Sequence, residues 1–313
     1  MRLLKFIVKR ILIMILTVLI VMFLVFCLLR TKNSNPLSTI IGTRALDQEA
    51  RQTQLEKYDL DKPVIVQYGI WLNGIFQGDW GISYDSKQPA FTEIGARIPV
   101  TVGLVVMSML IALIIAIPLG LICAYFKNGF FDGFINVILL VVSSTPPFLS
   151  SLLLLLLVSA LIPNYQFTLT YTNFFEYVQQ LFAPSIAVSF TMVGMIARVM
   201  RSSVMEQMKS NYYTTALAKG MQPRKIMIKH VLPNSIIPVL TISSIMVGVA
   251  VSGTLMAEYL FSLPGLGSLL LKAIQCYNYP LVEGIVLIIL VLFLVISFLV
   301  DILYTLIDPR ITL

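Results

Sequence analysis

The sequence predicts an all-α integral membrane protein with six transmembrane helices and a small extracytoplasmic subdomain after the first of them. Of its 313 residues, 58% are hydrophobic and only 12% are charged, and its mean hydropathy is +0.91. Soluble domains have about a quarter charged residues, so this chain has too few polar side chains to cover a soluble surface. Six apolar stretches also approach or exceed the length of about 20 residues that a helix needs to cross a bilayer.

The first apolar stretch, Ile11 to Leu29, follows four basic residues and so resembles the start of a secretory signal peptide. Its apolar part is longer than the usual run of about 7–15 residues, and no small-residue cleavage site follows it. We therefore predict an uncleaved membrane anchor.

The second predicted span is Val100 to Tyr125, and the third is Phe134 to Ile162. Pro146 and Pro147 should kink the third span, because proline removes a helical hydrogen bond. The other three predicted spans are Leu181 to Val204, Ile236 to Met256 and Leu281 to Leu306.

Basic residues indicate the orientation of these spans. The net charge of +7 and the pI of about 9.3 would also suit nucleic-acid binding, but the positions of the charges favour a membrane protein. With six spans, the N-terminal tail, Lys127, Arg310 and the stretch 198–230 share one side, and that stretch has seven Lys or Arg against one acidic residue. The opposite loop, 163–180, has no Lys or Arg. The positive-inside rule places both termini in the cytoplasm and predicts no nucleic-acid partner.

The segment from Arg30 to Arg97 is predicted to lie outside. It has eight basic and eight acidic residues, and long segments translocate largely regardless of charge. Apolar residues at Ile65, Tyr68, Ile70 and Leu72 have helical spacing, and a glycine-rich turn follows them. We expect a small, partly helical subdomain.

The stretch from Asn211 to Ser235 is polar, basic and interrupted by glycine and proline. Asn211 is a good N-cap for a helix over Tyr212–Lys219. Gly220 follows at the position after the helix, where a positive φ is common and glycine adopts it most easily. Pro223 suits the first turn of a second helix, which we expect to stop before Pro233. The stretch could lie on anionic lipid head groups, or it could dock a cytoplasmic partner, for which small residues such as Ala216 and Ala218 allow a close approach.

This stretch resembles the cytoplasmic signature of ABC importer membrane subunits: Glu-Ala-Ala, three residues, Gly, nine residues, Ile, one residue, Leu-Pro. The corresponding residues here are Thr214-Thr215-Ala216, Gly220, His230 and Leu232-Pro233. Thr214 and Thr215 replace Glu-Ala and His230 replaces Ile, but "TALAKG" is similar to the form of the peptide/nickel branch.

Three other segments resemble the same branch, so that the resemblance spans nearly the whole chain. "QYGIWLNGIFQGDWGISY" (67–84) is similar to its N-terminal motif, "AEYLFSLPGLGSLLLKAI" (257–274) to its external Glu-x-x-Phe-x-x-Pro-Gly-Leu-Gly segment, and "DILYTLIDPRI" (301–311) to its C-terminal motif.

The resemblance implies a permease of the dipeptide/oligopeptide/nickel ABC importer family, of the first-subunit type, with the type I importer permease fold. It implies a bacterial or archaeal plasma membrane location, a second homologous permease, two cytoplasmic ATP-binding subunits and an extracytoplasmic solute-binding protein. It also implies an anchor and external segment over 1–95, a permease domain over 96–307 and a cytoplasmic tail over 308–313. The implied ATPase-coupling residues are Tyr212, Tyr213, Thr215, Ala216, Ala218, Lys219, Gly220, Met221, His230, Leu232 and Pro233, and the implied external gate residues are Glu258, Pro264, Gly265 and Gly267.

The sequence lacks the residue patterns of an enzyme. It has no Gly-x-x-x-x-Gly-Lys-Ser/Thr loop for phosphate, and His230 is its only histidine. Its three cysteines, Cys27, Cys123 and Cys276, are far apart, so we expect neither a disulfide framework nor a metal site. We predict that the chain catalyses nothing and binds no cofactor, and that ATP and Mg²⁺ are used by partner subunits.

Other classes of membrane protein remain as alternatives: an ion-coupled secondary carrier, a channel or a non-transporting scaffold. A secondary carrier needs ionisable groups within its spans, but Glu258, Glu283 and Asp301 lie toward span ends and no two halves share a pattern.

Polar residues within two spans are candidates for the substrate path, although serine and threonine also serve helix packing in membranes. An uncharged path suits a peptide importer whose specificity lies in its binding protein. Nickel or a metal chelate is the second substrate class, and another small solute the third. The candidate path residues are Ser143, Ser144, Thr145, Ser243 and Ser244.

Overall fold

The computed structural model describes residues 2–30, 52–53, 55–56, 59–127, 129–162 and 173–307. In this part of the chain nearly all regular structure is helical, and one isolated bridge joins Ile82 to Pro89. The predicted tail at 308–313 and most of the predicted loop at 163–180 lie outside the described residues. The chain forms two compact units, one of Met1–Pro99 with Pro264–Leu294 and one of Val100–Leu263 with Val295–Leu313.

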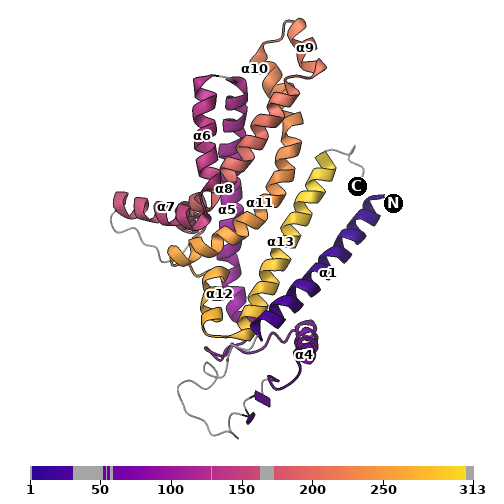
Figure 1. Cartoon of the computed structure of the whole chain (residues 1–313), viewed down its shortest axis with the longest axis vertical. Coiled ribbons are helices and arrows are strands. Elements are labelled where there is room, and N and C mark those ends of the chain that lie inside the picture. Colours follow the sequence, from indigo (N-terminus) through magenta and orange to yellow (C-terminus); the bar gives the residue numbers. More distant parts are fainter. Residues whose placement is uncertain are drawn as a thin grey trace. The chain divides into compact units, whose positions relative to one another are not determined.

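Five of the six predicted spans are confirmed as helices long and apolar enough to cross a membrane. The second predicted span starts earlier than Val100, because buried Ala90 and Ile94 extend the apolar face of its helix by further turns. The five helices are α1 (Arg2–Leu29), α5 (Ala90–Tyr125), α8 (Phe174–Gln207), α11 (Leu232–Leu260) and α13 (Tyr279–Ile307) (Figure 1).

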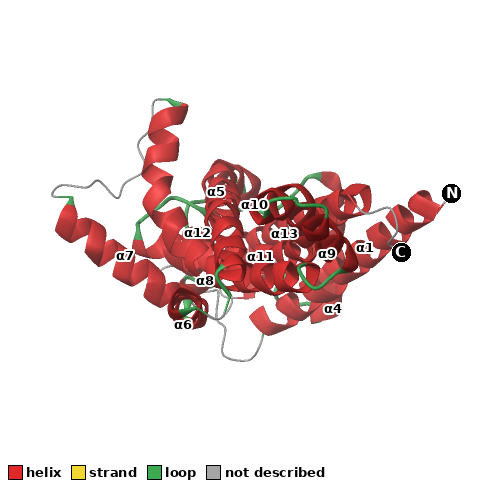
Figure 2. Cartoon of the chain, turned by 90° about the horizontal axis from the view of Figure 1, so that it is seen from above, coloured by secondary structure: helices red, strands yellow, loops and turns green. Residues whose placement is uncertain are grey.

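The third predicted span is two helices rather than one kinked helix. Helices α6 (Phe130–Ser144) and α7 (Pro147–Leu161) meet at 105°, so the pair is either a broken span or a re-entrant segment. Figure 2 shows α6 end-on and α7 from its side. The two adjacent prolines explain the break, because neither has an N–H and each forces the residue before it out of the helical region. Thr145 and Pro146 accordingly have extended ψ values of 122° and 142°.

The first compact unit contains α1, α4 (Val64–Gln77) and α12 (Leu266–Gln275), with parts of α5 and α13. Helix α4 confirms the helix expected from Ile65 to Leu72, and Gly78 ends it with a φ of 83°. A hydrophobic core of the first unit is formed by buried apolar residues of α5, α12 and α13, among them Ala90, Ile94, Leu266, Leu281 and Ile285.

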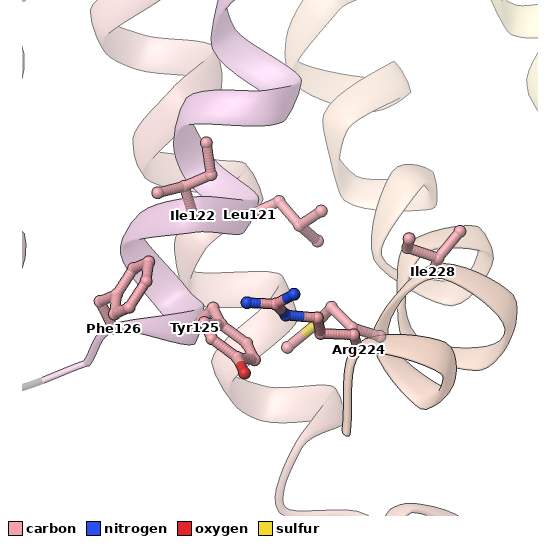
Figure 3. A pocket seen from close by; sticks show the side chains of 7 residues that line it. Leu121, Ile122, Tyr125, Phe126, Arg224 and Ile228 are labelled. Atoms are coloured by element: carbon pink, nitrogen blue, oxygen red, sulfur yellow. The ribbon is translucent and has the colours of Figure 1, made fainter. Parts of the chain in front are cut away.

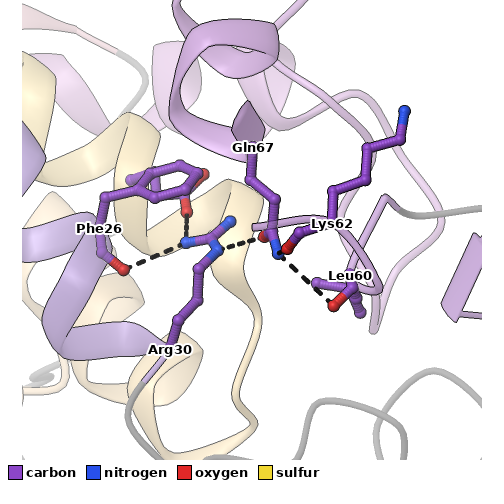
Figure 4. A network of polar contacts seen from close by, with 6 residues as sticks. Phe26, Arg30, Leu60, Lys62 and Gln67 are labelled. Carbon is purple, nitrogen blue, oxygen red and sulfur yellow. Dashed lines mark hydrogen bonds and ion pairs between the residues drawn. The ribbon is translucent and has the colours of Figure 1, made fainter. Parts of the chain in front are cut away.

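Arg30, directly after α1, ties three helices of this unit together (Figure 4). Its Nη1 lies 2.6 Å from a carboxylate oxygen of Glu283 on α13, and its Nε donates to the Gln67 side chain on α4 at 2.5 Å. Its guanidinium also lies 3.3 Å from the ring centroid of Phe26. The Glu283 side chain is only 3% exposed, so Arg30 supplies the positive charge that a buried carboxylate requires.

In the second unit, α8 packs against α6, α7 and α11. Helices α6 and α8 approach closely at Gly194, where a Cβ atom would lie 2.6 Å from the Leu139 carbonyl oxygen. Arg201 of α8 donates from Nε and Nη2 to the two carboxylate oxygens of Asp132 on α6, at 2.8 and 2.7 Å. The predicted span ended at Val204, and α8 continues to Gln207. Arg198 and Arg201 in its last turns have polar partners on α6, which for Arg198 is the Ser143 hydroxyl.

Candidate functional site

The stretch that carries the signature forms the expected helix, glycine turn and second helix. Helix α9 (Asn211–Ala218) is followed by Lys219 and by Gly220, whose φ is +79°, and α10 (Pro223–Ile226) begins at Pro223. We call Asn211–Ile226 the α9–α10 element. The predicted N-cap was wrong by one position: Ser210 is the extended residue before the helix, and its carbonyl accepts from the Tyr213 N–H at 3.2 Å.

The prediction that the second helix stops before Pro233 was also wrong. A π-helical turn, η1 (Met227–Val231), follows α10 and leads directly into α11. Pro233 lies in the first turn of α11, directly after the π-helical turn, where the Leu232 N–H bonds to the Met227 carbonyl five residues back. Such a local π-helical adjustment accommodates a proline within a membrane helix. The Asn234 side chain donates to the His230 carbonyl at 2.7 Å and so satisfies a backbone acceptor at this junction.

One side of the α9–α10 element belongs to the core of the second unit. Tyr213 and Ile226 of the element, with Met227 directly after it in η1, are at most 9% exposed and share a hydrophobic cluster with Met200 and Val204 of α8. Figure 1 shows α9 and α10 at the ends of α8 and α11. The element is therefore packed onto the helices that it connects and is not an unpacked loop between them.

The opposite side of α9 is open to solvent or to a partner. The hydroxyls of Thr214 and Thr215 both donate to the Asn211 carbonyl, at 2.9 and 2.8 Å, so they are satisfied within the helix. Leu217, 40% exposed, is an apolar residue on this side that the sequence interpretation missed. Its position between the two small residues Ala216 and Ala218 could have identified it in the sequence. The exposed residues of the element also include Tyr212, Ala218, Lys219 and Gly220.

The remaining signature residues occupy different environments. Ala216, Met221 and Leu232 are partly buried and pack against the core of the second unit. His230 is half-buried and Pro233 is exposed. The matched residues thus divide into those that anchor the element and those that a partner could contact.

Three of the candidate path residues gather at the break between α6 and α7. Ser143 accepts from the Arg198 guanidinium at 2.8 Å, and the Thr145 carbonyl accepts from the Thr191 hydroxyl at 3.1 Å. Ser144, between them, is exposed. The bond to Thr145 satisfies a backbone carbonyl at the break, as a bilayer requires, and the bond to Ser143 joins the last turn of α6 to α8.

The other two path candidates lie on α11 and differ from each other. Ser243 is 5% exposed, and its hydroxyl donates to the Val239 carbonyl of its own helix at 2.7 Å, as expected for a packing residue. Ser244 is half-buried.

The predicted gate residues fall in both compact units, and each part is described separately. In the second unit, Glu258 is fully buried and accepts from the Thr101 hydroxyl at 2.6 Å. In the first unit, Gly265 is the N-cap of α12, Gly267 is buried in that helix, and Pro264 is half-buried before it. Farther along α12, Lys272 donates a hydrogen bond to the Asp85 carboxylate at 2.8 Å, and this bond raises the pKa of Lys272. Among the side chains that the structure describes, no three His, Cys, Asp or Glu residues gather as a metal site would require.

Comparisons with known families match both parts of the chain. The model described as binding-protein-dependent transport system inner membrane component matches residues 116–313. The model for the N-terminal part of the membrane components of such systems matches residues 3–105.

Individual relatives align along almost the whole chain. The dipeptide transport system permease DppB of Escherichia coli K12 is 31% identical, with 98% of each chain covered. The DppB protein of Alkalihalophilus pseudofirmus is 30% identical over 91% of this chain and 92% of its own. A Brucella abortus protein provisionally named as a peptide transport system permease is 32% identical, with 94% of each chain covered.

Proposed function

Because the chain belongs to the family of inner membrane components of binding-protein-dependent transport systems, we propose that it is a permease subunit of an ATP-driven importer for dipeptides or oligopeptides. The names of its relatives support the peptide class. The structural observation that carries the proposal is the α9–α10 element, which has one side in the core of the spans and the other side open.

The proposed partners are those that the family implies. Two cytoplasmic subunits would bind and use ATP and Mg²⁺, and the chain itself would catalyse nothing, in keeping with a sequence that has no phosphate-binding loop. A second homologous permease would complete the path, and an extracytoplasmic binding protein would deliver the substrate. The membrane is the plasma membrane of a bacterium or archaeon, with both termini of the chain in the cytoplasm, as its basic residues favour.

In the proposed mechanism, ATP binding closes the two partner ATPases and moves the α9–α10 element. Because Tyr213, Ile226 and Met227 are packed into the core with α8, the movement is transmitted to the spans through packed side chains. The break between α6 and α7, with Ser143, Ser144 and Thr145, supplies polar groups to the path, and Ser244 can contribute to it from α11. The candidate external gate residues are Glu258, which pairs with Thr101 in the second unit, and Pro264, Gly265 and Gly267 at the start of α12 in the first unit.

Uptake by proteoliposomes tests the function. The chain is reconstituted with its second permease, its two ATPases and its binding protein, and accumulation of labelled dipeptides, tripeptides and Ni²⁺ is measured with and without ATP. We expect ATP-dependent accumulation of a peptide. Accumulation of Ni²⁺ alone would assign the chain to the metal-importing branch, and uptake driven by an ion gradient without ATP would contradict the proposal.

In the same assay, Gly220→Val should uncouple transport from ATP hydrolysis. No heavy atom lies within 4 Å of the position of a Cβ at Gly220, so the change acts through the backbone, whose φ of +79° disfavours a β-branched residue. We expect peptide uptake to fall by about tenfold, equivalent to a strain of about 1.4 kcal/mol, while ATP hydrolysis and membrane insertion continue.

Gly220→Asn is the matched control, because asparagine tolerates a positive φ far better than valine does. It should retain most of the uptake. If the valine variant transports as well as the asparagine variant, the glycine turn has no part in coupling.

A further inference from the structure

A pocket of about 210 Å³ opens between the end of α5 and the turn formed by α10 and η1, all within the second unit (Figure 3). Figure 3 shows Arg224 extending from α10 toward Tyr125 at the last turn of α5. The pocket is lined by Leu121, Ile122, Tyr125, Phe126, Arg224, Met227 and Ile228.

The walls of the pocket continue the apolar surface of a membrane span. Ile122 and Ile228 are 40% and 63% exposed, although both are large aliphatic residues. Tyr125 and Phe126 stand where α5 ends, and aromatic residues are favoured at the level of the lipid head groups. Along α5, the surface therefore changes from aliphatic to aromatic as a bilayer changes from acyl chains to head groups.

Arg224 is the one cation among the lining residues. Within the described part of the chain, no hydrogen bond or ion pair engages its guanidinium, whereas Arg201 and Arg30 each bind a carboxylate. Its surroundings in the sequence supply no acidic partner either, since there is no Asp or Glu from Gln207 to Ala257. An anion from outside the chain is the partner that this charge can bind.

We propose that the pocket holds one anionic phospholipid, with its phosphate on the Arg224 guanidinium and one acyl chain against the walls. A guanidinium binds phosphate through two parallel hydrogen bonds. The apolar walls can contact an acyl chain, so a phospholipid fits the pocket better than a soluble phosphate does. The lipid would rest on Met227 and Ile228 in η1, the π-helical turn that joins the α9–α10 element to α11. Single π-helical turns are often found at functional sites. This site is independent of which solute the importer carries.

Native mass spectrometry of the purified importer, titrated with dioleoyl phosphatidylglycerol or dioleoyl phosphatidylcholine, tests the site. Arg224→Gln is compared with Lys225→Gln, which removes the same charge from a neighbouring exposed residue outside the pocket. We expect Arg224→Gln to retain one phosphatidylglycerol about tenfold more weakly than Lys225→Gln does, because it alone loses the charge-assisted bonds.

Three results would overturn the site. Equal retention in the two variants would reduce the effect to general surface charge. Equal retention of phosphatidylcholine and phosphatidylglycerol by the unaltered importer would remove the role of the anionic head group. Loss of the ATPase subunits from Arg224→Gln, with phosphatidylglycerol retained, would assign the pocket to a protein contact instead.

Discussion

Asp132→Asn is expected to lower the free energy of unfolding of the second unit by about 3 kcal/mol, at the lower end of the cost of breaking a buried ion pair. Asp132 has a side chain only 6% exposed, and it accepts two hydrogen bonds from Arg201 and one from Asn136. Removing its charge leaves the Arg201 guanidinium within a span without a carboxylate. Titration with sodium dodecyl sulfate in mixed micelles measures the change.

Ser202→Ala is the matched control for this prediction. Ser202 neighbours Arg201, is exposed, and donates only to the Val199 carbonyl of its own helix, so its loss should cost little. Combining Asp132→Asn with Arg201→Gln should recover part of the stability, because no unpaired charge remains. The account of the α6–α8 contact fails if Asp132→Asn unfolds no more easily than Ser202→Ala.

Arg30→Ala should destabilise the first unit by a similar amount, about 3–5 kcal/mol. The substitution leaves the carboxylate of Glu283 buried without its cation, and it also removes the bonds to Gln67 and to the Phe26 carbonyl. Since Arg30 connects α1, α4 and α13, helix α1 should separate from α4 and α13 at a lower denaturant concentration than in the unaltered protein. The same micelle titration, followed through the fluorescence of Trp71 and Trp80, reports this unit because both tryptophans lie in it.

Arg30→Lys and the double variant Arg30→Gln with Glu283→Gln distinguish charge from geometry. Lysine keeps the cation but has no planar fork and should recover part of the loss. The double variant leaves no buried charge and should be more stable than Arg30→Ala. If Arg30→Ala unfolds like the unaltered protein, Arg30 does not hold the three helices together.

Most of the fold could be predicted from local patterns. Long apolar stretches marked five spans, and the glycine and proline positions marked the turn at Gly220 and the start of α10 at Pro223, because each requires one backbone conformation. The same residue types caused the two main errors. Pro146 and Pro147 produced a break of 105° instead of a kink, and Pro233 was expected to end the second helix but lies in the first turn of α11, into which that helix continues.

The polar contacts that hold the helices could not be predicted, because their partners are far apart in the sequence. Arg30 and Glu283 are separated by 253 positions, and Asp132 and Arg201 by 69. No periodicity relates such pairs, and only the packing of helices brings them together. For the candidate site, the signature identified the α9–α10 element, but it did not distinguish buried Tyr213 from exposed Leu217 or reveal the pocket beside Arg224.

Crosslinking between Ala218→Cys and the ATPase subunit tests most directly whether the α9–α10 element is the contact with the energy source. Cys27, Cys123 and Cys276 are first replaced so that the new thiol is unique, and Ile82→Cys, also exposed, serves as the control on the predicted extracytoplasmic side. A short thiol-to-amine reagent is applied to the assembled importer without nucleotide, with ATP and with ADP. We predict a crosslink from position 218 whose yield changes with nucleotide, and none from position 82. No crosslink from position 218 in any nucleotide state would contradict the coupling role of this element.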